Sequence, residues 1–198
     1  MTRFLVAACL AAALGGTASA ATTLDDLQTA HDGESNAAAR YKAFAARAEA
    51  EGYRGVARLF RAASRAETIH AQNHAKVIHA LGGTPRAVVA APTVKSTREN
   101  LQAAVAGETY ERDTMYPEFL ARARQDGNAA AVRTLNLARN AEIEHAKLYQ
   151  AALDDLDSQK SAGAPYYVCG VCGYTTRSLP VDKCPSSFSA REKFERID

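Results

Sequence analysis

The strongest constraint on the fold is a pair of Glu-x-x-His motifs, Glu67 to His70 and Glu142 to His145, that lie 75 residues apart. On an α-helix, residues three positions apart share a face, so each motif directs one carboxylate and one imidazole to the same point. The 75-residue shift also aligns several other pairs: Tyr41 with Tyr116, Phe44 with Phe119, Arg47 with Arg122, and Gly52 with Gly127. These matches predict a helical hairpin that has been duplicated.

The chain divides into four predicted helices. The first spans about residues 24–50, and the second spans about 54–81 and ends at Gly82 and Gly83. Ser96 and Glu99 have the spacing of a capping box, so a third helix begins there and ends near residue 125. The fourth follows Gly127 and ends near residue 156. Two short turns and one longer connection predict an all-α four-helix bundle with ferritin-like connectivity, two hairpins joined by a crossover.

Charge and the first twenty residues narrow the class of protein. Twenty-four Lys and Arg oppose 22 Asp and Glu without a basic stripe, which argues against nucleic acid as a partner. The first twenty residues predict a cleaved signal peptide. They contain a positive charge at Arg3, an apolar run over residues 4–14 and an Ala-x-Ala sequence at residues 18–20. We therefore expect an exported protein, periplasmic where the source has a periplasm. No other segment approaches the roughly 20 apolar residues of a membrane span, so we expect no membrane association after cleavage.

Further carboxylates complete a predicted metal site. Glu34 falls on the first helix, and Glu108 and Glu111 fall on the third. Together with the two motifs they give five glutamates and two histidines, with at least one glutamate on each helix. Burying so many carboxylates without a cation is too unfavourable, so the sequence predicts two metal ions between the helices. Oxygen-rich ligation with two imidazoles suits iron or manganese better than zinc.

Other acids and histidines have simpler explanations. His31 lies near Glu34 in the sequence, but we do not expect it to bind metal. The remaining candidates are expected to be solvated or satisfied by local contacts: Glu99, Glu144, His74 and His79.

These segments resemble the rubrerythrins over essentially the whole mature chain. The resemblance lies in the two Glu-x-x-His motifs and in the segments around Glu34 to Tyr41, Gly107 to Glu111 and Met115 to Phe119. Its most specific feature is the Glu-x-x-Glu pair on the third helix, since ferritins and bacterioferritins supply one glutamate there. Pro117 inside the third helix also fits, because proline in a helix interior indicates irregular local geometry.

The resemblance implies a di-iron centre that reduces hydrogen peroxide to water. By motif, Glu67 and Glu142 would bridge the irons, Glu34 and Glu108 would be terminal ligands, and His145 would hold one iron. The other iron would move between Glu111 when oxidised and His70 when reduced, which would make these two the catalytic ligands. Tyr41 and Tyr116 would orient ligand carboxylates through their hydroxyl groups; otherwise they are core aromatics. A homodimer is implied as well, with an electron-donor protein that the sequence does not identify.

The tail departs from the family pattern. Rubrerythrins end in a rubredoxin-like module with four thiolates on one iron, and Cys169 and Cys172 make a good first half of such a site. The second half has Cys184 but carries Ser187 where the fourth cysteine belongs. Three interpretations stay open: Ser187 ligates iron through its oxygen, the module keeps its shape without a working redox centre, or the three thiolates bind zinc with a water.

The sequence thus predicts three parts: a signal peptide (1–20), a ferritin-like di-iron domain (21–160) and a rubredoxin-like module (161–198). Retention of Glu111 favours a peroxide-reducing oxidoreductase. The missing fourth cysteine favours the alternative, a ferroxidase or iron-binding protein that needs no electron donor. A bundle with vestigial sites is a third interpretation.

Overall fold

The computed structural model describes residues 21–198, so the predicted signal peptide lies outside the described residues. The helices are α1 (Thr23–Ala50), α2 (Arg54–Ala80), α3 (Thr97–Tyr110), α4 (Tyr116–Gln125) and α5 (Ala129–Asp154). Between residues 21 and 198, none of the helices combines the length and the apolar character that crossing a membrane requires. A short 3-10 helix, η2 (Asp157–Lys160), leads from α5 to the tail.

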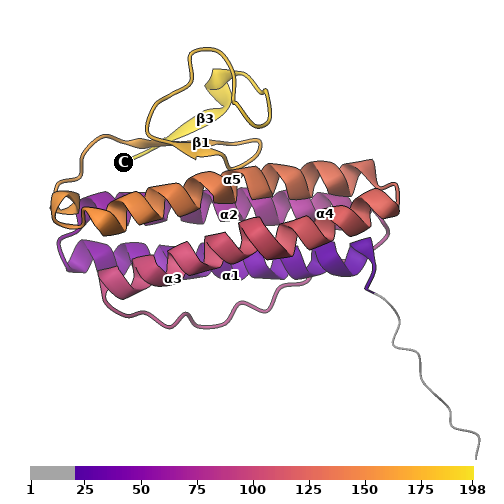
Figure 1. Ribbon diagram of the computed structural model, residues 1–198, viewed down its shortest axis with the longest axis horizontal. Helices are drawn as coiled ribbons and strands as arrows, with labels where there is room; N and C mark the ends of the chain where they lie inside the picture. The colour runs from indigo at the N-terminus through magenta and orange to yellow at the C-terminus, as the bar shows by residue number, and fades with distance from the viewer. Residues whose placement is uncertain (1–20) are drawn as a thin grey trace, which may run out of the picture.

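The helices form the predicted four-helix bundle. In Figure 1, α1 and α2 make one hairpin, and α3 with α4 runs as a single rod that pairs with α5. Gly52 and Gly127 have positive φ angles of 82° and 64°, the left-handed conformation that ends a helix at a tight turn. The predicted all-α bundle with two hairpins is therefore confirmed.

Helix starts follow the capping chemistry of the sequence. The predicted capping box is present, with the Ser96 side chain and Glu99 satisfying each other's backbone N–H groups at the start of α3. A second capping box, formed by Thr22 and Asp25, begins α1 one residue earlier than the apolar pattern indicated.

The third predicted helix contains a π-helical segment, η1 (Glu111–Met115), between α3 and α4. Before this segment the two hairpins match at a shift of 74 residues, as with Leu27 and Leu101 or Glu34 and Glu108. After it they match at 75, as with Tyr41 and Tyr116. A π-helical turn holds one residue more than an α-turn, so η1 absorbs a one-residue insertion in the second hairpin.

The crossover between the hairpins, residues 81–96, runs along the opposite side of the bundle from the tail (Figure 1). It is fastened to α1 by side chain to backbone hydrogen bonds. The Val88 N–H donates to Asp32 at 2.7 Å, and the Ala90 N–H donates to Asn36 at 3.0 Å. These bonds satisfy backbone groups of a segment that has no secondary structure of its own.

Two apolar clusters occupy the bundle on either side of a polar layer. One contains Phe44, Phe60 and Tyr149, and the other contains Leu27, Phe119 and Leu135, among further residues. On α1 and α5, the glutamates and histidines of the predicted metal site fall between the residues of one cluster and those of the other, and on α2 His70 does so. The polar layer is therefore closed off by packed side chains at both ends.

The tail forms a small antiparallel sheet, with strands β1 (Tyr166–Cys169), β2 (Thr175–Thr176) and β3 (Phe194–Ile197) in the order β2-β1-β3. Another 3-10 helix, η3 (Arg191–Lys193), precedes β3. The sheet lies on the side of the bundle formed by α2 and α5 (Figure 1). Arg65 on α2 makes two bonds of 2.7 Å to Glu195 on β3, which hold the tail against the helix.

Candidate metal centre

Six of the predicted ligands meet in two overlapping groups inside the bundle. The first group consists of Glu34, Glu67, His70 and Glu142, and the second consists of Glu67, Glu108, Glu142 and His145. Within each group, one ligand atom from every residue lies within 4.8 Å of the others. Since Glu67 and Glu142 belong to both groups, the arrangement is that of two metal positions sharing two carboxylates.

The oxygens of the shared carboxylates divide between the two histidines. His70 Nδ1 lies 2.8 Å from Glu67 Oε2 and 3.1 Å from Glu142 Oε1. His145 Nδ1 lies 2.8 Å from Glu142 Oε2 and 3.2 Å from Glu67 Oε1. Each of these glutamates thus offers one oxygen to each metal position, as a bridging carboxylate does.

The facing atoms do not satisfy one another. Both oxygens of Glu67 and of Glu142, together with Nδ1 of both histidines, are buried without a hydrogen-bond partner among the described residues. The short nitrogen–oxygen distances therefore join atoms that point to common centres rather than at each other. Because buried polar atoms are rarely left unpaired, these orphaned atoms fit a pair of metal ions.

The tail fixes the histidine tautomers from outside. His70 Nε2–H donates to the carbonyl oxygen of Cys172 at 3.0 Å, since a carbonyl can only accept. His145 Nε2 lies 2.9 Å from the Thr175 hydroxyl, which itself donates to the Gly173 carbonyl, so His145 is the donor here as well. When the rings are neutral, as metal binding requires, this donation leaves the Nδ1 lone pair of each facing the site.

Two buried tyrosines donate to the terminal carboxylates. Tyr41 OH donates to Glu108 Oε1 at 2.5 Å, and Tyr116 OH donates to Glu34 Oε1. Each tyrosine belongs to the hairpin that does not carry the glutamate it contacts. The two hydroxyls therefore join the hairpins through the carboxylates that they contact; the predicted role of these tyrosines in orienting metal ligands stays a prediction.

Burial and crowding set the protonation of the metal-free site. Burial and the charge of Glu67 raise the pKa of Glu108 to about 7. Burial, Glu67 and Glu142 raise the pKa of Glu34 well above its usual range. Although burial opposes its charge, Glu67 is held at a lowered pKa by His145 and His70. The site thus holds protons that bound cations would displace.

Glu111, the seventh predicted ligand, belongs to neither group, although the charges of Glu34 and Glu108 act on it. It is half-buried at the start of η1, where burial and the charge of Glu34 raise its pKa. The structure brings His70, and not Glu111, into the first group. The predicted exchange between Glu111 and His70 stays a prediction.

The residues expected to be unimportant fall into two kinds. Glu144 pairs with Lys147 at the surface, and His79 is exposed. His31 lies outside both groups and contacts the Ala71 carbonyl at 3.0 Å. His74, however, is fully buried rather than solvated.

His74 extends the hydrogen bonding of Tyr116 away from the site. Its Nε2 lies 3.2 Å from the Tyr116 hydroxyl and its Nδ1 lies 3.1 Å from the Thr134 hydroxyl. Tyr116 donates to Glu34, so His74 Nε2–H donates to Tyr116 and Thr134 donates to His74. The sequence held one signal that His74 lies near the site: it follows His70 by four residues, which is one turn along the same face of the helix.

In the tail, Cys169, Cys172 and Cys184 are fully buried free thiols that converge on one point. Hydrogen bonds from Cys172 and Cys184 lower the pKa of the Cys169 thiol, and the same contact with Cys169 raises the pKa of Cys172. One buried negative charge is thus favoured on Cys169. The cluster suits a soft divalent cation.

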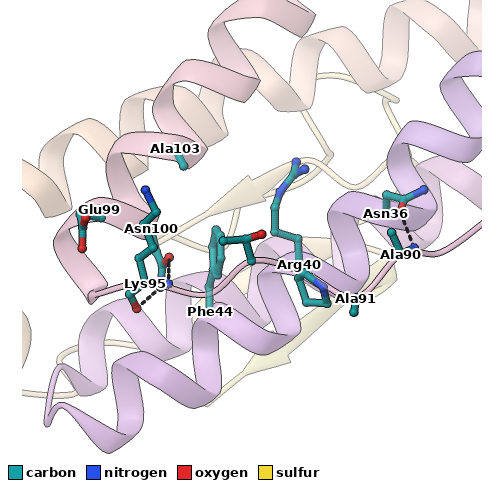
Figure 2. A pocket seen from close by; sticks show the side chains of 11 residues that line it. Asn36, Arg40, Phe44, Ala90, Ala91, Lys95, Glu99, Asn100 and Ala103 are labelled. Carbon is teal, nitrogen blue, oxygen red and sulfur yellow. Dashed lines mark hydrogen bonds between the residues drawn. The ribbon is translucent and has the colours of Figure 1, made fainter.

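A cavity of about 400 Å³ lies between α1, the crossover and the start of α3 (Figure 2). Arg40 forms part of its wall, and the Arg40 guanidinium carbon lies 5.3 Å from the centre of the Tyr41 ring. None of the clustered carboxylates or histidines lines this cavity. It therefore adjoins the Tyr41 side of the centre without opening into it.

The chain is similar to known proteins over most of its length. A sequence profile of the Rubrerythrin family matches residues 25–153. Nigerythrin of Nitratidesulfovibrio vulgaris is 38% identical, with 87% of this chain and 85% of that protein covered. Rubrerythrin-2 of Clostridium acetobutylicum is also 38% identical, with 88% and 96% covered. A solved structure of fully reduced, all-ferrous nigerythrin superimposes with a TM-score of 0.83 at 35% identity, covering 93% and 91% of the two chains.

Proposed function

The chain belongs to the rubrerythrin family, and we propose that it is a di-iron oxidoreductase that reduces hydrogen peroxide to water. The observation that carries this proposal is the pair of carboxylates, Glu67 and Glu142, shared by two four-residue groups. Iron is the proposed metal because the donor set is rich in oxygen and because the similar nigerythrin structure is described as all ferrous. Two bound ferrous ions would supply the two electrons that, with two protons, convert one peroxide into two waters.

The protein's own residues would prepare the centre for this chemistry. Packed apolar clusters at both ends limit the access of water, which strengthens electrostatic interactions inside. Tyr41 and Tyr116 hold the terminal carboxylates Glu108 and Glu34 in place. Each tyrosine hydroxyl is hydrogen-bonded to a carboxylate whose pKa is raised. Protons can therefore be held close to the reacting oxygens.

The position of the tail supports electron entry on the α2 side. Cys172 supplies both a thiol to the cysteine cluster and a carbonyl to His70. A single residue therefore connects the two sites within one chain. This contact favours the peroxidase over a ferroxidase, which needs no electron donor.

The experiment that tests the proposal follows peroxide and an electron carrier together. The full chain, loaded anaerobically with Fe²⁺, is mixed with chemically reduced viologen dye and hydrogen peroxide, and both are monitored by stopped flow. We expect one peroxide to be lost for every two electrons withdrawn from the dye, well above the rate without protein. The ferroxidase would instead consume Fe²⁺ and leave the dye reduced, and that result would reject the peroxidase.

Export and assembly remain proposals of the same kind. We propose that residues 1–20 are removed during export to the periplasm, so that the mature chain begins at Ala21; the intact mass of protein from a periplasmic fraction tests this. A homodimer is also proposed from the family resemblance and is tested by sedimentation. In the structure the tail packs on its own bundle, so bringing the cysteine cluster to His70 does not require a second copy.

A further inference from the structure

The two turns that carry the tail cysteines share one backbone hydrogen bond and a left-handed residue at the same position, although only the first turn has the expected residues. In the first turn the Gly173 N–H donates to the Cys169 carbonyl at 2.8 Å, and Gly173 has a φ of 76°. In the second turn the Phe188 N–H donates to the Cys184 carbonyl at 3.0 Å, and Phe188 has a φ of 59°. Ser187 therefore occupies in the second turn the place that Cys172 occupies in the first.

Phe188 makes this correspondence informative. It stands where the first turn has a glycine, and a residue with a Cβ disfavours the left-handed conformation. Its side chain is 73% exposed, so burial of the ring does not explain why the turn is kept. A strained turn that places a serine against a cluster of thiols points to a function for that serine.

The distances match a tetrahedral metal site. Cys172 Sγ and Cys184 Sγ are 3.6 Å apart, near the roughly 3.8 Å between two sulfurs that each lie about 2.3 Å from one metal. Ser187 Oγ lies 3.5 Å from Cys169 Sγ, and sulfur and oxygen ligands of one tetrahedral metal are separated by about 3.5 Å. The backbone N–H of Ser187 also donates to Cys184 Sγ at 3.5 Å, as expected for a group next to a thiolate.

Ser189 is the other hydroxyl near the cluster, and its place is different. Its Oγ lies 3.4 Å from Cys169 Sγ and 2.9 Å from Ser187 Oγ. Ser187 contacts two of the sulfurs, Cys169 Sγ through its hydroxyl and Cys184 Sγ through its backbone N–H, whereas the Ser189 hydroxyl contacts the sulfur of Cys169. Ser187 thus faces the centre of the cluster, and Ser189 is placed to donate a hydrogen bond to the Ser187 oxygen from outside it.

We propose that the tail holds one divalent metal ion through the thiolates of Cys169, Cys172 and Cys184 and the side-chain oxygen of Ser187, with Ser189 supporting that oxygen. The site is a three-sulfur, one-oxygen variant of the family's four-thiolate centre. A hard oxygen in place of a soft sulfur favours the oxidised form of iron, so iron held here is harder to reduce than in a four-thiolate site. This inference concerns the tail alone and stands whether or not the bundle reduces peroxide.

Cobalt(II) is a suitable probe because, among residues 21–198, every thiol lies in the tail, so thiolate-to-cobalt charge-transfer bands report on that cluster. The carboxylate and histidine site would also accept cobalt but offers no thiolate. The full chain, reduced and free of oxygen, is titrated with Co²⁺ alongside three variants: Ser187→Cys, Ser187→Ala and Ser189→Ala. Circular dichroism checks that each variant is folded.

We expect the wild type to bind one Co²⁺ in the tail with tetrahedral visible bands. Ser187→Cys should raise the charge-transfer intensity by about one third, since four thiolates replace three. Ser187→Ala should weaken tail binding about tenfold or more, and Ser189→Ala should weaken it less. If the wild type gives no charge-transfer band, or if Ser187→Ala keeps the wild-type affinity and spectrum, the proposal is wrong.

Discussion

The Nε2 atom of His70 lies 3.0 Å from the carbonyl oxygen of Cys172, so a residue of the tail cysteine cluster holds a histidine of the bundle's metal centre. Gly173, the next residue, makes this approach possible. A Cβ at Gly173 would lie 2.2 Å from His70 Nε2 and 3.1 Å from the Ala66 carbonyl oxygen. Neither the backbone of α2 nor a metal-binding ring can move easily, so the contact requires glycine.

Replacing Gly173 should therefore separate the two sites. We expect Gly173→Ala to move the turn away from His70 and to slow electron transfer from the tail to the bundle, while both sites still bind metal. The rate at which peroxide-oxidised protein is re-reduced through the tail measures this effect.

Gly52→Ala is the matched control for that variant. Gly52 has a similar φ of 82°, but a Cβ there would meet nothing within 4 Å. The Gly52→Ala substitution therefore imposes a comparable backbone strain without a steric clash. Equal re-reduction rates in the two variants would show that the close approach at Gly173 has no role.

The two tyrosine hydroxyls should matter for metal retention. Tyr41→Phe and Tyr116→Phe each remove the donor to one terminal carboxylate, Glu108 or Glu34, and leave the ring in the core. We expect each to lower metal affinity about 10- to 100-fold, as loss of such supporting hydrogen bonds commonly does. Tyr53→Phe serves as a control, because Tyr53 is only partly buried and lies away from the ligands. If both tyrosine variants bound the metal with unchanged affinity, the tyrosines would contribute to core packing and not to metal retention.

His74 should make the fold sensitive to acid. Burial, followed by the charges of His70 and His31, lowers the pKa of His74 to about 3. In the unfolded chain the group titrates near its ordinary value of about 6.5. Below about pH 6.5 His74 is protonated in the unfolded chain but stays neutral in the folded protein, so the free energy of unfolding falls as the pH falls.

The size of this effect can be measured by difference. Between pH 8 and pH 5 the His74 contribution amounts to roughly 2 kcal/mol of lost stability. Denaturant unfolding of the wild type and of His74→Gln, in the same metal state, should show the wild type losing that much more than the variant. If the free energy of unfolding depended on pH in the same way for the wild type and for His74→Gln, His74 would have to be protonated in the folded protein.

The helices and the clustering of the glutamates and histidines were largely predictable from the sequence because their signals are local. The Glu-x-x-His spacing, the capping box at Ser96 and the glycines at the hairpin turns each determine structure within a few residues. The π-helical segment was missed, although the change from a 74-residue to a 75-residue shift around Glu111 was a usable signal.

Long-range contacts were not predictable in the same way. The bonds from His70 to Cys172 and from His145 to Thr175 join residues 102 and 30 positions apart. The burial of His74 likewise depends on Thr134, which is 60 positions away. Docking of the tail on α2 and α5 creates the first two contacts and hairpin packing creates the third, and neither leaves a periodic pattern in the sequence.

The most direct test of the account is the number of iron ions bound per chain after anaerobic addition of Fe²⁺, compared between the wild type, Glu142→Gln and Glu144→Gln. Because Glu142 belongs to both four-residue groups, its replacement should release both bundle ions together. Glu144, two residues along α5, pairs with Lys147 at the surface, so its replacement should leave the number of bound ions unchanged. We predict about three ions for the wild type and Glu144→Gln, two in the bundle and one in the tail, and about one for Glu142→Gln. A wild type that binds no iron in the bundle, or a Glu142→Gln variant that loses only one ion, would contradict a centre bridged by shared carboxylates.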